Sequence, residues 1–245
     1  MKSTVIGAAS LVLAAAAGAA LLMIVPRHDP SVPVLRAAGD RPALKLLTGL
    51  PLYFGDHFGL PQGSPALLRL RTRYAVEVIN TSEARALGSG GLLLAAQPQA
   101  QTAANLVALD RWVRAGGRLL LLADPILEWP SQAPLGSPLR PPYAFADTGL
   151  LAHWGLRLDA PDRAGAAQRT IGGQRVETLA PGTLAAIAGG TARCRVEQPG
   201  IVAACRIGRG VAIIVADADF IDPSGRSTAG AGLDAMMVEL ARLER

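Results

Sequence analysis

Two short apolar runs joined through an amphipathic stretch give the clearest pattern in the chain. Residues 91–96 and 118–123 are almost wholly apolar, as expected of strands buried on both faces of a sheet. Between them, residues 102–115 have helical spacing, with Leu109 and Val113 on one face, and a Gly-Gly pair follows as a stop. Two buried strands joined through one helix form a right-handed βαβ unit, so this stretch predicts a parallel sheet.

The same alternation extends on both sides of this unit. Residues 44–50 and 74–79 read as strands, with a helix over residues 64–73 between them, and residues 211–216 form another buried apolar run before a closing helix. Beyond residue 163 the chain becomes rich in strands and glycine turns. The pattern predicts a doubly wound α/β domain with a mostly parallel sheet and an antiparallel, strand-rich C-terminal extension.

The N-terminal segment differs from the rest in composition. Residues 4–25 carry no charge, and a helix of this length spans about 30 Å, the thickness of the hydrocarbon core of a bilayer. Residues 1–25 are therefore a transmembrane anchor or a signal segment; the long apolar run favours an uncleaved anchor. Residues 26–42 form a proline-rich linker, and residues 43–245 form the folded domain. A domain left in the cytoplasm is the alternative topology, because the flanking charges give only a weak bias.

The two cysteines are informative by their position. Cys194 and Cys205 flank a Pro199-Gly200 pair, and a hairpin turning there would put the two cysteines directly opposite one another. Opposed residues on neighbouring strands lie within the range that a disulfide needs, which would fit an oxidising compartment. Two small buried thiols are the alternative.

The charge of the chain does not indicate a nucleic-acid partner. The formal net charge is +5, but the chain has few lysines, scattered arginines, and no basic stripe interleaved with aromatic residues. Half of the residues are apolar and the mean hydropathy is +0.30, partly because of the N-terminal segment. We interpret the charge as surface solvation and predict no nucleic-acid binding.

Polar residues follow several of the predicted strands, where open parallel sheets bind their ligands. Gln97, Asp124, Asp217 and Asp219 should lie at this edge, and His57 lies on the loop after the first strand. The carboxylates could bind a polar ligand or a hard cation. The alternative, which we favour, is that the aspartates cap turns and backbone amides.

No arrangement of residues identifies a reaction. The turn after residues 91–96 carries Gln97 and not the cysteine that an amidotransferase-like enzyme needs. A serine-hydrolase elbow would need glycine where Leu87 stands, and neither a phosphate-binding loop nor a Cys/His metal spacing occurs. We therefore predict no catalytic residue, no metal site and no cofactor. Residues 126–147 contain five prolines and no period, which predicts a long loop acting as a functional flap or as a mobile insertion.

Three stretches occur in a familiar order before the closing helix: GLLLAAQPQ…LVALDRWVRAGGRLLLLADP, TGLLAHWGLRL and GRGVAIIVADADFI. Together they resemble the extracytoplasmic domain of the GldG-like family, auxiliary components of ABC-type transport systems. The resemblance covers roughly residues 44–243. It implies a flavodoxin-like fold, related to class I glutamine amidotransferases, for residues 43–245.

These observations lead to one expected function. The chain is expected to be a single-pass protein of the inner membrane, held in the bilayer by residues 4–25, with its C-terminal domain in the periplasm. It would be a non-catalytic binding or assembly module whose partners are membrane-embedded proteins, such as an ABC-type permease. The alternative is a metal-dependent hydrolase or an amidotransferase-like enzyme that uses carboxylates at the sheet edge.

Overall fold

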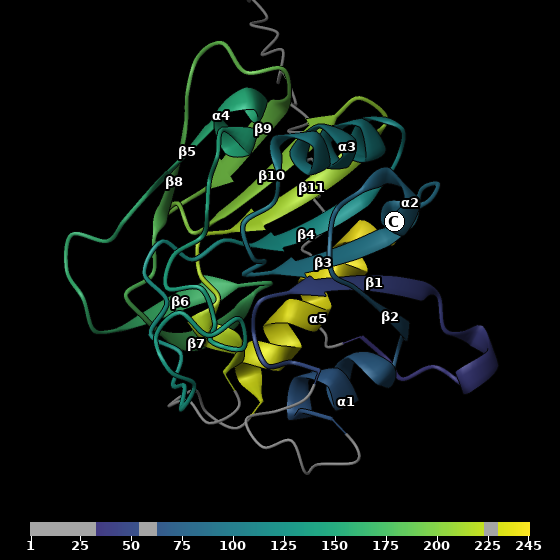
Figure 1. The fold of residues 1–245 in the computed structure, drawn as a ribbon, viewed down its shortest axis with the longest axis horizontal. Helices are drawn as coiled ribbons and strands as arrows, with labels where there is room; N and C mark the ends of the chain where they lie inside the picture. The colour runs from purple at the N-terminus through teal and green to yellow at the C-terminus, as the bar shows by residue number, and fades with distance from the viewer. Residues whose placement is uncertain (1–32, 54–62, 223–229) are drawn as a thin grey trace, which may run out of the picture.

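A seven-stranded sheet forms the centre of the domain. The computed structural model describes residues 33–53, 63–222 and 230–245 (Figure 1). The strand order is β2-β1-β3-β4-β11-β10-β9; the first five strands are mutually parallel, and β10 and β9 continue the sheet antiparallel. The strands are β1 (Ala43–Thr48), β2 (Ala75–Ile79), β3 (Leu92–Ala96), β4 (Arg118–Leu122), β9 (Arg193–Glu197), β10 (Val202–Ile207) and β11 (Gly210–Val215). The predicted α/β class with a mostly parallel sheet is confirmed.

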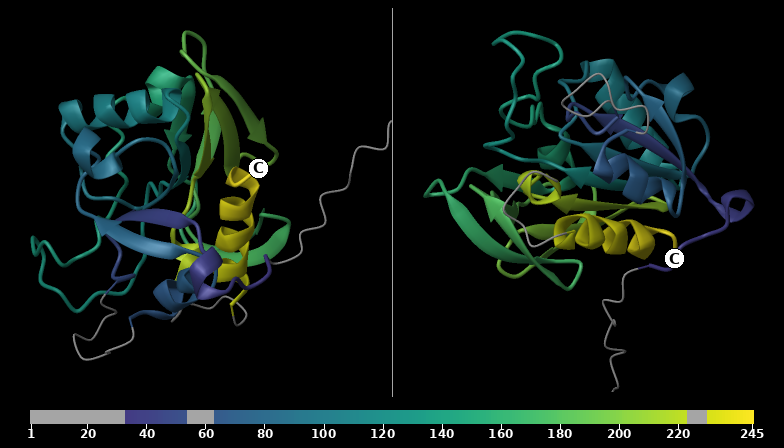
Figure 2. Two further views of the ribbon diagram at one scale, coloured as in Figure 1. Left: turned by 90° about the vertical axis from the view of Figure 1, so that its right-hand side faces the viewer. Right: turned by 90° about the horizontal axis from the view of Figure 1, so that it is seen from below.

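Helices cover both faces of this sheet (Figures 1 and 2). One face packs against α1 (Pro65–Arg71) and α5 (Ala231–Leu243), and the other against α2 (Ala84–Leu87), α3 (Ala103–Arg114) and α4 (Leu150–Trp154). The central strands are apolar on both sides because each side is a core. The closing helix α5 is buried through Met236, Met237 and Leu240.

Local signals in the sequence account for the helix boundaries. The Ser64 hydroxyl accepts a hydrogen bond from the backbone N–H of Leu67 at 3.1 Å, and a proline opens α1 directly after it. The Thr102 hydroxyl accepts the N–H of Asn105 at 3.2 Å at the start of α3. These caps satisfy amide groups that have no partner inside the helix.

The antiparallel, strand-rich C-terminal part that the sequence predicts is present, and part of it extends the main sheet. Its strands β9 and β10 belong to the main sheet because β11 returns beside β4 and offers an edge to β10. Two small antiparallel sheets remain outside it: β5 (Leu156–Asp159) with β8 (Thr183–Ala186), and β6 (Ala166–Ile171) with β7 (Gln174–Leu179).

Because the five strands are parallel, all of them begin at one edge of the sheet and end at the other. We call the edge where the five parallel strands begin the amino edge, and the edge where they end the carboxyl edge. The first described residues, through the short 3-10 helix η1 (Ala38–Asp40), and the C-terminus both lie at the amino edge (Figures 1 and 2). The loops that follow the strands, and the 3-10 helix η2 (Asp219–Ile221), lie at the carboxyl edge.

Among the residues that the structure describes, no helix is long and apolar enough to cross a membrane. The expected anchor, residues 4–25, lies outside the described residues, as do residues 26–32 of the predicted linker.

Candidate functional site

The residues proposed from the sequence gather at the carboxyl edge, where they hold the loops together. Gln97 follows β3 and is fully buried. Its amide oxygen accepts the backbone N–H of Asp124 at 2.8 Å, and its amide nitrogen donates to the carbonyl oxygens of Asp124 at 3.0 Å and Pro142 at 3.3 Å. The side chain therefore joins the ends of β3 and β4 to the proline-rich loop of residues 126–147.

Gln97 has a strained backbone. Its φ of 41° lies in the left-handed region, which costs a non-glycine residue roughly 1 kcal/mol or more. The three side-chain hydrogen bonds offset this cost, because they are made only if the residue turns in this way. In this conformation the carbonyl oxygen of Gln97 also accepts the N–H of Gly49, just after β1, at 3.1 Å. The turn at Gln97 is therefore held against the end of β1.

Asp124 links two segments that lie far apart in the sequence. Its two carboxylate oxygens accept the backbone N–H groups of Ile126 and Ala218, each at 2.9 Å. Burial raises the pKa of Asp124 to about 6, although these hydrogen bonds favour the ionised form. The side chain is fully buried, so its oxygens face the protein interior and not solvent.

Asp217 and Asp219 play similar parts after β11. Asp217 accepts the Thr178 hydroxyl at 2.5 Å and the N–H of Phe220 at 3.0 Å, and Asp219 accepts the N–H of Glu128 at 3.0 Å. Burial, followed by the charge of Asp124, raises the pKa of both carboxyls, that of Asp219 to about 8. Asp217 thus caps the turn that follows it, as in the alternative favoured by the sequence pattern, whereas Asp219 binds the backbone of a distant loop.

The described residues contain no group of three His, Cys, Asp or Glu side chains that could hold a metal ion. The aspartates thus meet at one edge, but their oxygens are directed to backbone amides. His57, the remaining candidate, lies outside the described residues.

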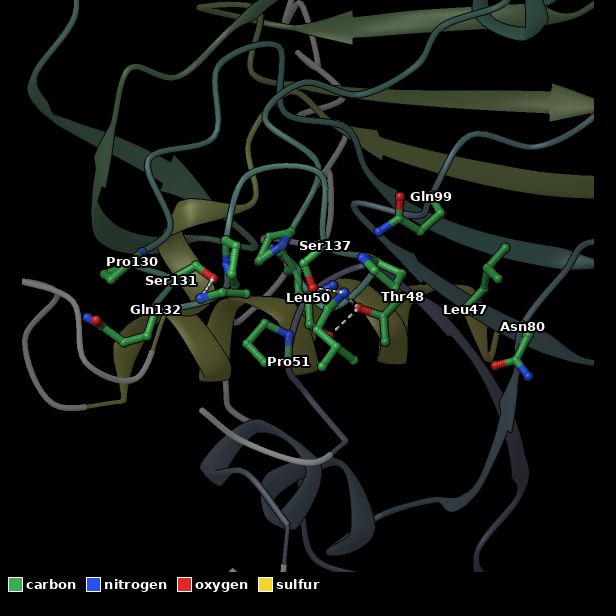
Figure 3. Close-up of a pocket in the computed structure, with 16 residues that line it drawn as sticks. Leu47, Thr48, Leu50, Pro51, Asn80, Gln99, Pro130, Ser131, Gln132 and Ser137 are labelled. Atoms are coloured by element: carbon green, nitrogen blue, oxygen red, sulfur yellow. Dashed lines mark hydrogen bonds between the residues drawn. The ribbon is translucent and has the colours of Figure 1, made fainter. Parts of the chain in front are cut away.

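A crevice opens beside this network, at the ends of β1, β2 and β3. It encloses about 740 Å³ (Figure 3). Thr48, Asn80 and Gln99 line it from the strand side. Prolines and small polar residues of the loop line the opposite side. Its 16 lining residues are Leu47, Thr48, Gly49, Leu50, Pro51, Asn80, Gln99, Pro130, Ser131, Gln132, Ala133, Pro134, Ser137, Pro138, Leu139 and Pro141.

The chemistry of this crevice is neutral. None of the described lining residues is charged; the polar ones carry hydroxyl or amide groups, and the rest are mostly leucine and proline. The Thr48 hydroxyl is held by the carbonyl oxygen of Ala96 at 3.0 Å, whereas Asn80 and Gln99 are exposed. Such a site can donate and accept hydrogen bonds and cover apolar surface, but it offers no counter-ion.

The crevice was not among the sites predicted from the sequence, although a signal for it was present. Asn80 directly follows β2, and Gln99 comes three residues after β3, so the rule that selected Gln97 applies to them equally. The loop side of the crevice had no such signal, because its position depends on contacts with the network around Gln97.

Cys194 and Cys205 are directly opposite one another on β9 and β10, the register that the Pro199-Gly200 turn predicts. The structure joins them by a disulfide, with their Cα atoms 4.0 Å apart. The bond lies within the main sheet and ties its outermost strand to the next.

Comparison with known proteins finds similarity only among solved structures. No family model matches the chain, and no curated protein matches it. The N-terminal domain of mmIFT52 is 15% identical, with a TM-score of 0.48, over 82% of this chain and 96% of that domain. The exo-β-1,4-mannosidase Op5Man5 from Opitutaceae bacterium strain TAV5 is 14% identical, with a TM-score of 0.44, over 83% of this chain and 36% of the enzyme.

The GH42 β-galactosidase Gan42B is 17% identical, with a TM-score of 0.44, over 83% of this chain and 30% of the enzyme. The chain thus spans about a third of the glycoside hydrolases that it matches. These similarities assign it no substrate or reaction. They do correct the expectation of a non-catalytic module, because the matched structures include a mannosidase and β-galactosidases.

Proposed function

We propose that the chain is an extracytoplasmic binding component of an ABC-type transport system, held in the inner membrane by residues 4–25, and that its ligand binds in the crevice at the carboxyl edge. The position of the crevice carries the binding part of this proposal. The association with a transport system rests on the resemblance to the GldG-like family in three stretches of the sequence.

The crevice lies where a flavodoxin-like domain would bind its ligand. Numbered along the parallel part of the sheet, the order β2-β1-β3-β4-β11 corresponds to 2-1-3-4-5, the flavodoxin-like order. In that order the crossover connections change sides between the first and third strands, and ligands bind outside the carboxyl ends there. Thr48 at the end of β1 and Gln99 after β3 line the crevice at this point.

The disulfide supports a domain outside the cytoplasm. Disulfides persist in oxidising compartments such as the periplasm and are rare in the cytosol, where thiols are kept reduced. The Cys194–Cys205 bond, together with the uncharged residues 4–25, favours a single-pass protein with its C-terminal domain in the periplasm. Membrane-embedded partners, such as a permease, are proposed from the same resemblance to the GldG-like family.

The lining of the crevice indicates the class of ligand. A charged group loses its hydration on entering such a site, and this loss must be offset by a partner of opposite charge. The described lining offers none, whereas its amide and hydroxyl groups suit a neutral polar ligand with some apolar surface. We therefore propose an uncharged ligand, or an uncharged segment of a partner protein.

Site-specific photocrosslinking in membranes tests this function. A photoreactive residue replaces Gln99 at the mouth of the crevice or, as a control, Ala152, which is exposed on α4. We expect crosslinks to transporter subunits or to a neutral ligand from Gln99 only. Identical products from both positions would refute the binding site. A second test uses a reporter that is active only in the cytoplasm, fused after Arg245. Activity of this reporter would refute the proposed location.

A further inference from the structure

Arginine side chains collect at the amino edge of the sheet, opposite the candidate site. Arg118 begins β4, Arg193 begins β9, Arg206 comes near the end of β10, and Arg209 lies in the turn to β11. Arg111 lies in the last turn of α3. All five are exposed, and none forms an ion pair with a carboxylate among the described residues.

Ordinary helix chemistry explains only part of this gathering. Cations are stabilising near helix C-termini, which accounts for Arg111. Arg193 and Arg206, in contrast, stand directly opposite one another on neighbouring strands. Like charges in this position are destabilising, so their presence needs another reason.

The chain that precedes the domain leaves from the same basic edge. Glu244, just after α5, accepts hydrogen bonds from Arg36 at 2.6 Å, from Arg73 at 2.8 Å and from the Tyr74 hydroxyl at 2.6 Å. Arg73 also donates to the carbonyl oxygen of Val34 at 3.0 Å. These contacts fix the beginning of the described chain between β2 and the end of α5.

The remaining distance to the apolar segment is short. Residues 26–33 connect the end of the uncharged segment to the fixed residues, and eight residues span at most about 28 Å when fully extended. If residues 4–25 cross the bilayer, as proposed above, the beginning of the described chain at the amino edge lies no more than about 28 Å from the lipid surface. The crevice at the carboxyl edge then faces away from it.

We infer that the exposed arginines of the amino edge dock the domain onto anionic phospholipid headgroups. The inference rests on the proposed anchor. Clustered arginines next to a membrane segment are attracted to anionic lipids, and this attraction falls off within a Debye length, about 8–10 Å at physiological salt. Docking fixes the domain with its crevice outward, toward partners away from the membrane.

Fluorescence in nanodiscs tests this inference on the full-length chain. A fluorophore replaces Gly39 at the amino edge or Ala100 near the carboxyl edge, and the headgroups carry a quencher. Discs contain phosphatidylcholine alone or with phosphatidylglycerol. We expect quenching of the Gly39 label to increase with phosphatidylglycerol by about twofold and to fall back in 0.5 M salt. The Ala100 label should not respond.

The variant R193Q/R206Q should remove the response to phosphatidylglycerol. Neither side chain has an internal hydrogen bond or ion pair among the described residues, so folding should be retained. R163Q/R175Q changes the net charge equally at exposed positions flanking β6 and in β7 and should keep the response. Quenching that is independent of lipid charge would overturn the inference, as would loss of co-purifying protein partners in R193Q/R206Q without any change in quenching.

Failure of the anchor can be separated from failure of the docking surface. If the chain does not enter nanodiscs, the proposed anchor is refuted. The chain is then tested by flotation with vesicles of the same two lipid compositions. Salt-sensitive flotation with phosphatidylglycerol that is lost in R193Q/R206Q would support the basic surface without the anchor. No flotation would overturn both proposals.

Discussion

The substitution D219N probes the cost of a buried charge at the carboxyl edge. Asp219 is only 7% exposed, and its carboxylate accepts one backbone N–H, that of Glu128. Burial raises its pKa from the ordinary 3.8 to about 8, with a further contribution from the nearby charges of Asp124, Glu128 and Asp222. Asparagine keeps the shape and the accepting oxygen but cannot ionise.

The sign and size of the effect follow from this shift. Because the folded protein binds the proton more tightly than the unfolded chain, the stabilisation is complete below pH 3.8 and is lost as the pH rises to about 8. The full shift corresponds to about 6 kcal/mol, of which about 4 kcal/mol falls between pH 5 and pH 8. These are upper limits, because water and side-chain relaxation reduce the effect of a buried charge.

Thermal unfolding of the full-length chain in detergent measures this difference. For a domain of this size about 1 kcal/mol shifts the melting temperature by about 2–4 °C, so the wild type should melt several degrees lower at pH 8 than at pH 5. D219N should show a clearly smaller decrease and should be the more stable of the two at pH 8. The control D40N removes an exposed carboxylate of η1 and should follow the wild type. An unchanged pH profile in D219N would refute the assignment.

Three further substitutions test other features of the fold. C205A removes the disulfide, so it should cost about 2–4 kcal/mol of stability and expose one thiol to maleimide, whereas the oxidised wild type exposes none. G49A places a Cβ 2.5 Å from the carbonyl oxygen of Gln97, so it should lower the free energy of unfolding by about 1–3 kcal/mol and speed proteolysis of the proline-rich loop. The control G39A meets no atom within 4 Å and should leave stability unchanged. W154F removes the indole hydrogen bond to the Asp110 carboxylate on α3, which is 2.8 Å long, and should lower the free energy of unfolding by about 1.5–3 kcal/mol in chemical denaturation. The control W112F should cost less, because the buried indole N–H of Trp112 has no partner among the described residues.

The strands of the sheet were predictable because burial on both faces leaves a continuous apolar run. Residues 91–96 and 118–123 anticipated β3 and β4 within one residue, and the glycine turns anticipated the hairpins of the C-terminal half. The joining of β9 and β10 to the main sheet was not predictable in this way. It depends on the edge that β11 offers after returning beside β4, which no local pattern records.

The polar residues at the strand ends were predictable in position, whereas the crevice beside them was not. The rule that places polar residues at strand ends brought Gln97, Asp124 and Asp217 to one edge. It could not say whether their oxygens turn inward or outward, because a capping aspartate and a ligand-binding aspartate occupy the same place in the sequence. The path of the loop of residues 126–147 could not be predicted, because its apolar residues follow no regular spacing. The loop is held by backbone hydrogen bonds, such as that from the N–H of Leu127 to the carbonyl oxygen of Tyr143 at 2.8 Å.

The disulfide has a consequence for how sheets of separate molecules can meet. An outermost strand presents unpaired backbone groups that can recruit another chain and start aggregation. At one end of the sheet, β9 is tied covalently to β10 and cannot peel away. The opposite end is β2, a five-residue strand held to β1 by non-covalent contacts and carrying Glu77, which pairs with Lys45 at 3.1 Å. Detachment of an outermost strand, which would expose the backbone groups of its neighbour, would therefore begin at β2, and a charge there is the kind of residue that opposes pairing with another chain.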